Sequence, residues 1–236
     1  MLSFSQIRTF FETLSVDYFL QKFFEGLWNT IKIAVLGLVI GIIIGTVIAI
    51  VKVAPKYRRS MRFLDKVCTV YVAIFRGTPM VVQLLLTYYV ILPICGVQMS
   101  ALAVGFLVFG MNSGAYVSEI MRGGINSVDK GQLEAARAVG LSYPTSMLKV
   151  VIPQAIKNIL PTLGNEFITL IKETSVVSFI SVYDLYSAFN TIGASNYEKL
   201  IPYAALAVIY IVLVFGITLL IKLLERSFNK SERKRA

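Results

Sequence analysis

Long apolar stretches alternate with shorter polar connections along the whole chain. Five of these stretches approach or exceed the roughly 20 residues that an α-helix needs to cross the ~30 Å hydrocarbon core of a bilayer. The fourth is the least hydrophobic because it contains Glu166, Lys172 and Glu173. The pattern predicts an all-α integral membrane protein with five transmembrane helices, at residues 33–51, 67–92, 99–118, 156–180 and 200–221.

Small residues recur every four positions in two of these stretches. Gly37, Gly41 and Gly45 form one stripe, and Gly110 and Gly114 repeat the spacing in the third stretch. Such stripes let helices approach closely in a membrane, so we expect tight packing at both.

The two ends of the chain differ from the apolar middle. Residues 1–26 mix aromatic and charged side chains, which favours one amphipathic helix lying at the membrane interface. We expect residues 27–225 to form a transmembrane domain that starts near the interfacial Trp28, and residues 226–236 to form a basic cytoplasmic tail.

Composition and charge support a membrane protein and orient it. Only 15% of residues are charged, against about 25% in soluble domains. Lys and Arg number six in 52–66, five in 121–157 and six in 222–236, but only four (positions 8, 22, 32 and 199) outside the spans on the other side. The positive-inside rule therefore predicts a cytoplasmic C-terminus and an external N-terminus. Contact with lipid headgroups explains the net charge of +10 better than nucleic acid does.

The longest basic connection contains a spaced motif. Glu134-Ala135-Ala136 is followed by three residues, Gly140, nine residues and then Val150-Val151-Ile152-Pro153. Residues 131–139 have a helix-forming composition, and Gly140 suits the left-handed conformation that ends a helix. Ser142 and Pro144 suit the cap and first turn of a second helix, so we expect two short helices with a sharp corner at residues 140–143.

This spacing resembles the EAA loop of ABC importer permeases, although Val150 and Ile152 replace the usual Ile and Leu with other aliphatic residues. The resemblance implies that the loop, about residues 131–157, docks on an ATPase subunit. The implied coupling residues are Glu134, Ala135, Ala136, Ala138, Gly140, Leu141, Ser142 and Pro144.

Three further segments resemble the polar amino-acid branch of that family: Phe-Arg-Gly-Thr-Pro at 75–79, Tyr-x-x-Glu-x-x-Arg-Gly-Gly-Ile at 116–125, and Leu-Gly-Asn to Thr-Ser at 163–175. The resemblance implies a type I ABC importer permease fold in a bacterial inner or plasma membrane, and uptake of an amino acid or similar small polar solute. The implied partners are an ATPase dimer, an extracytoplasmic solute-binding protein and a second permease chain, identical or related.

The chain lacks an ATP-binding motif of its own. A P-loop needs a Gly-Lys pair, and none of the 16 Gly residues is followed by Lys. The chain also has no His, and it shows no metal-ligand cluster or nucleophile motif. We therefore expect a transport subunit rather than an enzyme, with ATP and magnesium bound by the partner ATPase. A self-sufficient channel, an ion-coupled transporter and a membrane scaffold are the alternatives.

Charged residues inside membranes are costly and usually functional or paired. Arg76 lies ten residues beyond Lys66, about 15 Å along a helix. The neighbouring Gly77, Thr78 and Pro79 predict a broken helix. The segment either shapes the transport pathway or has a structural role, in which Arg76 pairs with a carboxylate such as Glu119.

Polar side chains on the third and fourth stretches are candidates for substrate contact. A zwitterionic amino acid needs an acceptor for its ammonium and donors for its carboxylate. The alternative role for these side chains is hydrogen bonding between helices. The candidates are Asn112, Tyr116, Glu173, Thr174, Ser175 and Ser178.

Overall fold

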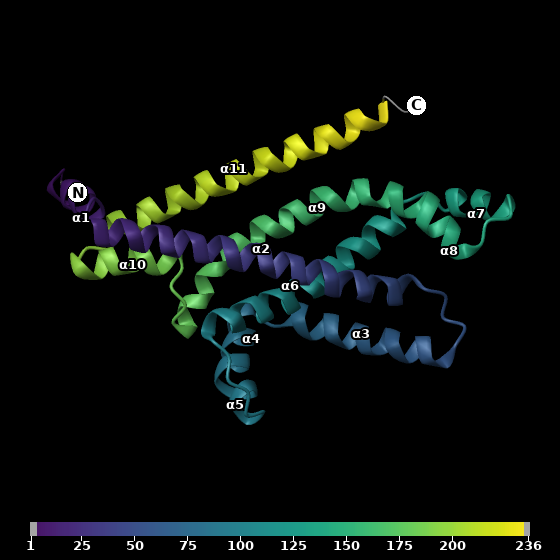
Figure 1. The fold of residues 1–236 in the computed structure, drawn as a ribbon, viewed down its shortest axis with the longest axis horizontal. Helices are drawn as coiled ribbons and strands as arrows, with labels where there is room; N and C mark the ends of the chain where they lie inside the picture. The colour runs from purple at the N-terminus through teal and green to yellow at the C-terminus, as the bar shows by residue number, and fades with distance from the viewer. Residues whose placement is uncertain (1–3, 234–236) are drawn as a thin grey trace. The chain divides into compact units, whose positions relative to one another are not determined.

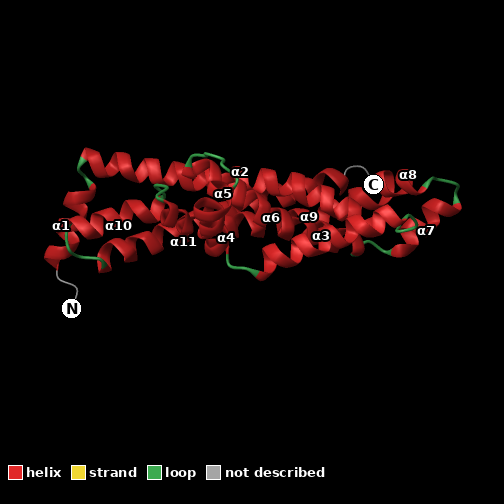
Figure 2. Cartoon of the chain, turned by 90° about the horizontal axis from the view of Figure 1, so that it is seen from below, coloured by secondary structure: helices red, strands yellow, loops and turns green. Residues whose placement is uncertain are grey.

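The computed structural model describes residues 4–233, and the described chain consists of helices and the turns between them (Figure 1). Figure 2 shows the helices in red and their short connections in green. In chain order they are α1 (Phe4–Leu14), α2 (Asp17–Val53), α3 (Arg59–Gly77), α4 (Met80–Leu86), η1 (Thr87–Ile91), α5 (Leu92–Ile94), α6 (Ala101–Asn126), α7 (Lys130–Ala138), α8 (Tyr143–Ser146), η2 (Met147–Val151), α9 (Ile152–Glu173), η3 (Thr174–Ile180), α10 (Leu185–Ser195) and α11 (Leu200–Arg233).

The chain divides into two compact units. Unit 1 contains Met1–Gly37, Pro79–Phe109 and Ile168–Leu219. Unit 2 contains Leu38–Thr78, Gly110–Phe167 and Leu220–Ala236. Four of the five boundaries fall within α2, α6, α9 and α11, so each of these helices contributes residues to both units, and the fifth lies between α3 and α4.

Three helices in the described part of the chain are long and apolar enough to cross a membrane: Asp17–Val53, Ala101–Asn126 and Leu200–Leu223. The broken pair of α3 with α4–α5 makes a fourth if it counts as one span. The predicted span at 156–180 is not among them. It overlaps α9, whose charged residues lower its hydropathy, and it changes to a 3₁₀ helix at Thr174. The five-helix count and the orientation stay predictions.

The N-terminal segment is not the single element expected at 1–26. Helix α1 ends at Leu14, and residues 17–26 already belong to α2, which is 37 residues long. In unit 1, α1 packs on α10 through Phe10, whose ring stacks on Phe189 at a centroid distance of 6.4 Å. Phe11 is exposed beside it. The interfacial location of 1–26 and the basic tail at 226–236, of which 234–236 lie outside the described residues, stay predictions.

The start of α10 is held against the N-terminal half of α2 in unit 1. Asp184 is fully buried and caps α10 by accepting hydrogen bonds from the backbone N–H of Ser187 and Tyr186. A Cβ at Gly26 would lie 2.5 Å from the Asp184 carbonyl oxygen, so only glycine fits there. Thr30 accepts a hydrogen bond from the Leu185 N–H at 3.2 Å. The cap and the glycine together fix where α10 begins.

Unit 2 confirms the tight packing expected of the small residues. A Cβ at Gly41 would lie 2.6 Å from Ser113 Oγ, and one at Gly110 would lie 2.6 Å from Ile40 Cβ. These contacts bring α2 and α6 together at backbone distance. Helix α6 thereby becomes a fixed support for the polar groups described next.

Candidate functional site

The EAA loop forms the corner predicted from its sequence. Asp129 caps α7 by accepting a hydrogen bond from the Gly131 N–H at 2.6 Å. Gly140 follows with φ of +85°. The Leu141 N–H donates to the Ala136 carbonyl at 3.2 Å, which satisfies an end carbonyl of the helix. Ser142 then caps α8 by accepting from the Thr145 N–H at 3.3 Å. We call residues 138–144 the coupling corner.

Most of the predicted coupling residues are exposed on unit 2. Ala136 is the exception, because it is buried and packs inward rather than toward solvent, and Leu141 is half-buried. Val139 was missed by the sequence interpretation, yet its side chain is 78% exposed beside the corner. The exposed members are Glu134, Ala135, Ala138, Gly140, Ser142 and Pro144.

The second arm of the loop is not a separate short helix. Helix α8 has four residues and continues through the π-helical turn η2 directly into α9. Side-chain contacts hold the first arm and its approach against α9: Gln154 Nε2 donates to Gln132 Oε1 at 3.3 Å, and Asn158 Nδ2 donates to Ser127 Oγ at 2.8 Å. The Tyr143 hydroxyl also donates to the Val53 carbonyl at the end of α2, at 3.4 Å. The corner is therefore tied to both α2 and α9 within unit 2.

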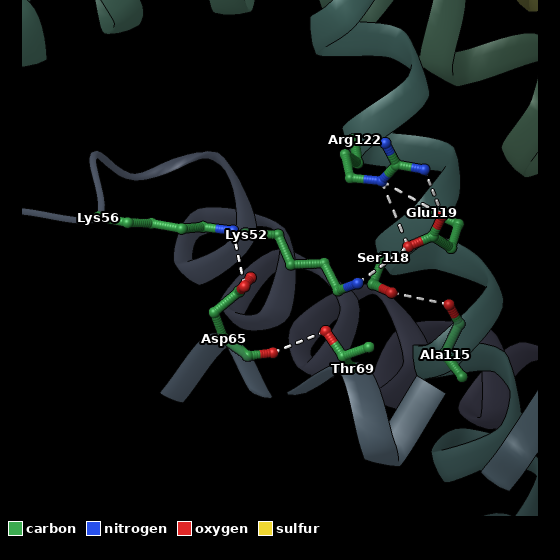
Figure 3. Close-up of polar contacts among 8 residues, drawn as sticks. All are labelled: Lys52, Lys56, Asp65, Thr69, Ala115, Ser118, Glu119 and Arg122. Atoms are coloured by element: carbon green, nitrogen blue, oxygen red, sulfur yellow. Dashed lines mark hydrogen bonds and ion pairs between the residues drawn. The ribbon is translucent and has the colours of Figure 1, made fainter. Parts of the chain in front are cut away.

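Glu119 lies at the centre of an ion-pair cluster (Figure 3). Arg122 Nη2 lies 2.6 Å from Glu119 Oε2, one turn along α6. Lys52 Nζ, from the end of α2, lies 3.5 Å from Glu119 Oε1. Figure 3 also shows a separate pair, Lys56 Nζ with Asp65 Oδ2, at 2.7 Å. Two cations therefore neutralise Glu119 without Arg76.

The predicted break at residues 76–79 is present, but the suggested ion pair of Arg76 with Glu119 is not. Helix α3 ends at Gly77, and Thr78 adopts an extended backbone conformation before Pro79. The Arg76 guanidinium lies over the Tyr116 ring, 5.3 Å from its centroid. Glu119 is already bound by Arg122 and Lys52, which explains why the expected pair does not form.

The six substrate candidates fall into two groups in different units. In unit 2, Asn112 is buried and its Nδ2 donates to the Phe75 carbonyl at 3.3 Å, while Tyr116 lies next to Arg76. In unit 1, Thr174 is fully buried and its hydroxyl donates to the Ile171 carbonyl in the last turn of α9. Glu173 is half-buried at the end of α9.

Ser175 and Ser178 line a cavity of about 520 Å³ in unit 1. The other polar lining residues are Tyr186, Ser187 and Asn190 of α10, which the sequence interpretation did not select because they lie beyond the predicted fourth span. Ser187 Oγ donates to Asp184 Oδ1 at 2.7 Å, and Asn190 Oδ1 accepts from the Tyr203 hydroxyl at 2.9 Å. Val176 and Phe179 complete the lining, so the cavity combines polar and apolar side chains and none of its lining residues is charged.

The described residues contain no group of three or more His, Cys, Asp or Glu placed to hold a metal ion. Buried acidic side chains in this part of the chain contact other protein groups. Asp184 is the clearest case, because burial raises the pKa of its carboxyl while the hydrogen bonds from Ser187 and Tyr186 oppose the rise. We assign this carboxylate a structural role as a helix cap.

Comparison with known proteins gives consistent matches over most of the chain. Residues 18–230 match the family described as "Binding-protein-dependent transport system inner membrane component". The putative glutamine transport system permease protein GlnP of Rickettsia felis is 38% identical over 202 residues, covering 86% of this chain and 90% of the relative. The arginine transport system permease protein ArtQ of Bacillus subtilis is 38% identical over 208 residues, covering 88% and 93%.

Solved structures agree in fold. A chain from the crystal structure of an amino acid ABC transporter with histidines superposes with a TM-score of 0.82 at 40% identity, covering 91% of this chain and 97% of that one. A chain of the inward-facing MetNI methionine ABC transporter superposes with a TM-score of 0.72 at 18% identity, which shows the shared fold alone. The all-helical architecture is thus that of an ABC transporter membrane subunit.

Proposed function

Because this chain belongs to the binding-protein-dependent transport system inner membrane components, we propose that it is the permease subunit of an importer that carries an amino acid, or a similar small polar solute, into the cytoplasm. The relatives named for glutamine and arginine transport support the solute class. An ATPase dimer supplies ATP hydrolysis, with its ATP and magnesium. An extracytoplasmic binding protein delivers the solute, and a second permease chain completes the pathway in a bacterial cell membrane.

The coupling corner is the observation that carries this proposal. Gly140 and the caps at Asp129 and Ser142 define a rigid turn, and Val139 and Pro144 are exposed on it. An exposed apolar residue next to small side chains suits the groove of a partner protein. We infer that the ATPase subunit binds here, with Ala135 and Ala138 allowing close approach and Ala136 acting only as internal packing.

Reconstitution tests the proposal directly. The chain is purified with its ATPase, incorporated into liposomes with its binding protein, and supplied with radiolabelled L-glutamine, L-arginine or L-cystine. We expect uptake of at least one of them that requires internal ATP and the ATPase subunit. Uptake that continues unchanged without the ATPase would identify a channel or ion-coupled transporter instead.

A second measurement addresses the docking role of the corner. Gly140→Asp places a charge on the exposed tip of the corner. Gly140→Asn introduces a side chain of nearly the same shape as Asp but without the charge, and both residues tolerate a positive φ. We expect Asp to reduce co-purification of the ATPase far more than Asn. Equal and normal association of both variants would place the ATPase contact elsewhere.

A further inference from the structure

Arg76 is a charged residue in the middle of a segment expected to cross the membrane, and it is exposed on unit 2. It lies ten residues beyond Lys66 on the continuous helix α3, about 15 Å along the axis. The half-thickness of the hydrocarbon core is also about 15 Å. This places the guanidinium far from the headgroup phosphates, so a lipid phosphate is a poor partner for it.

No carboxylate among the described side chains of unit 2 forms an ion pair with Arg76. Glu119, on the same helix as Tyr116, is bound by Lys52 and Arg122. Glu166 accepts a hydrogen bond from Ser113 Oγ at 2.9 Å. A guanidinium at membrane depth without an anionic partner is costly, and ionisable residues at that depth mark substrate or ion pathways.

Neutral groups fix the end of α3 and orient the guanidinium. Asn112 Nδ2 donates to the Phe75 carbonyl at 3.3 Å, and the Tyr71 hydroxyl donates to the Met111 carbonyl. The Tyr116 ring then lies 5.3 Å from the guanidinium carbon. A cation–π contact holds the cation without supplying a hydrogen-bond acceptor in the guanidinium plane, so N–H donors remain for a planar anion.

We propose that Arg76 binds the carboxylate of the transported solute, with Tyr116 orienting the guanidinium for that contact. The planar fork of Arg matches a carboxylate with two parallel hydrogen bonds, which Lys cannot reproduce. The inference rests on the proposed function, because it names the part of the amino acid that this chain recognises. It also assigns a role to Asn112, which positions the end of α3 rather than touching the solute.

The test compares each amino acid with its α-carboxamide, which lacks the negative charge. Equilibrium binding of L-glutamine, L-arginine and L-cystine, and of their carboxamides, is measured on the permease–ATPase complex in nanodiscs without binding protein. We expect the wild-type complex to favour the free acid of its substrate by about tenfold or more, as a charge-assisted contact provides. Arg76→Gln should remove that preference by weakening the acid alone, and Arg76→Lys should keep part of it.

Arg62→Gln is the matched control, because Arg62 is an exposed arginine near the start of the same helix. It should retain the wild-type preference. If Arg76→Gln fails to assemble, Arg76→Lys and Tyr116→Leu serve in its place, and each should reduce the preference for the free acid.

The proposal is overturned if the wild-type complex binds none of the three amino acids or shows no preference for the acid. An unaltered preference in Arg76→Gln, as when Arg76 pairs with a second permease chain, also overturns it. ATP-driven uptake by the wild type is scored separately, so failure of this inference leaves the proposed function standing.

Discussion

Lys52 and Glu119 connect the end of α2 to α6 through an ion pair of 3.5 Å, and Arg122 binds the same carboxylate at 2.6 Å. The side chains of Lys52 and Glu119 are only 14% and 20% exposed. Removing Glu119 leaves two cations without a partner, whereas removing Lys52 leaves Arg122 to neutralise the carboxylate. The two substitutions should therefore differ in their effect on folding.

We expect Glu119→Gln to lower the free energy of unfolding by about 3 kcal/mol, and Lys52→Met by about 1 kcal/mol. Chemical unfolding of the detergent-purified protein measures both. Lys56→Met is the control, because the Lys56–Asp65 pair is more exposed and should contribute under about 1 kcal/mol. Similar losses for Glu119→Gln and Lys56→Met would contradict a central role for Glu119.

The close approach of α2 and α6 predicts a size-dependent defect at Gly110. A methyl group there would overlap Ile40, so Gly110→Ala should destabilise the protein by about 2 kcal/mol. Ile40→Ala in the same chain should recover part of this loss by making room. Gly216→Ala is the control, since nothing lies within 4 Å of a Cβ at that position of α11. It should be neutral or stabilising by up to about 1 kcal/mol. Thermal unfolding distinguishes the four proteins.

The positive φ of Gly140 predicts a backbone effect at the coupling corner. Gly140→Ala must adopt a left-handed conformation, which costs about 1 kcal/mol locally, although nothing lies within 4 Å of the added methyl group. We expect the membrane domain to keep its unfolding temperature while ATP-driven uptake falls several-fold. A matched alanine at Gly123, where space is also open but the backbone is helical, should leave uptake unchanged.

Burial of Asp184 predicts a pH dependence of stability. Burial raises the pKa of this carboxyl above its ordinary value of 3.8, so the folded protein binds the proton more tightly than the unfolded chain. The contribution of Asp184 to stability is therefore greatest below that value and falls as pH rises through the folded pKa. Asp184→Asn keeps the cap without a titrating group.

Unfolding temperatures measured from about pH 4 to about pH 7 compare the two proteins. The variant should lose stability less steeply than the wild type as pH rises, because it has no buried charge to form. Asp129→Asn is the control, since Asp129 caps α7 at an exposed position. A wild-type protein and an Asp184→Asn variant with parallel pH profiles would show that Asp184 makes no such contribution.

Local chemistry explains which features the sequence could predict. Gly140, Ser142 and Pro144 each favour one backbone conformation, so the corner follows from neighbouring residues alone. The glycine stripes that include Gly41 and Gly110 likewise predict close helix packing, but they do not identify which helix packs there. The break after Gly77 follows from Pro79, which restricts the residue before it.

Features that depend on distant residues were not predictable in this way. The ion pair of Glu119 with Lys52 joins positions 67 residues apart, and motif reading favoured Arg76 instead. The early start of α2 at Asp17 reflects packing of Phe23 and Phe10 on Phe189 in unit 1. The cavity at Ser175 and Ser178 is completed by residues of α10. Helix α10 lies in the connection between two predicted spans, so the apolar pattern did not identify it.

The π-helical turn between α8 and α9 has a mechanical consequence. Because α8, η2 and α9 follow one another without a loop, helical backbone continues from Tyr143 to Glu173, and the turn before it holds Gly140 at φ of +85°. We expect a displacement of the coupling corner to be transmitted along this helical segment, because the Gln154 and Asn158 side chains also join α9 to residues that precede the corner. The movement that reaches the membrane part then depends on the length of this helical segment, because no loop lies between the coupling corner and α9.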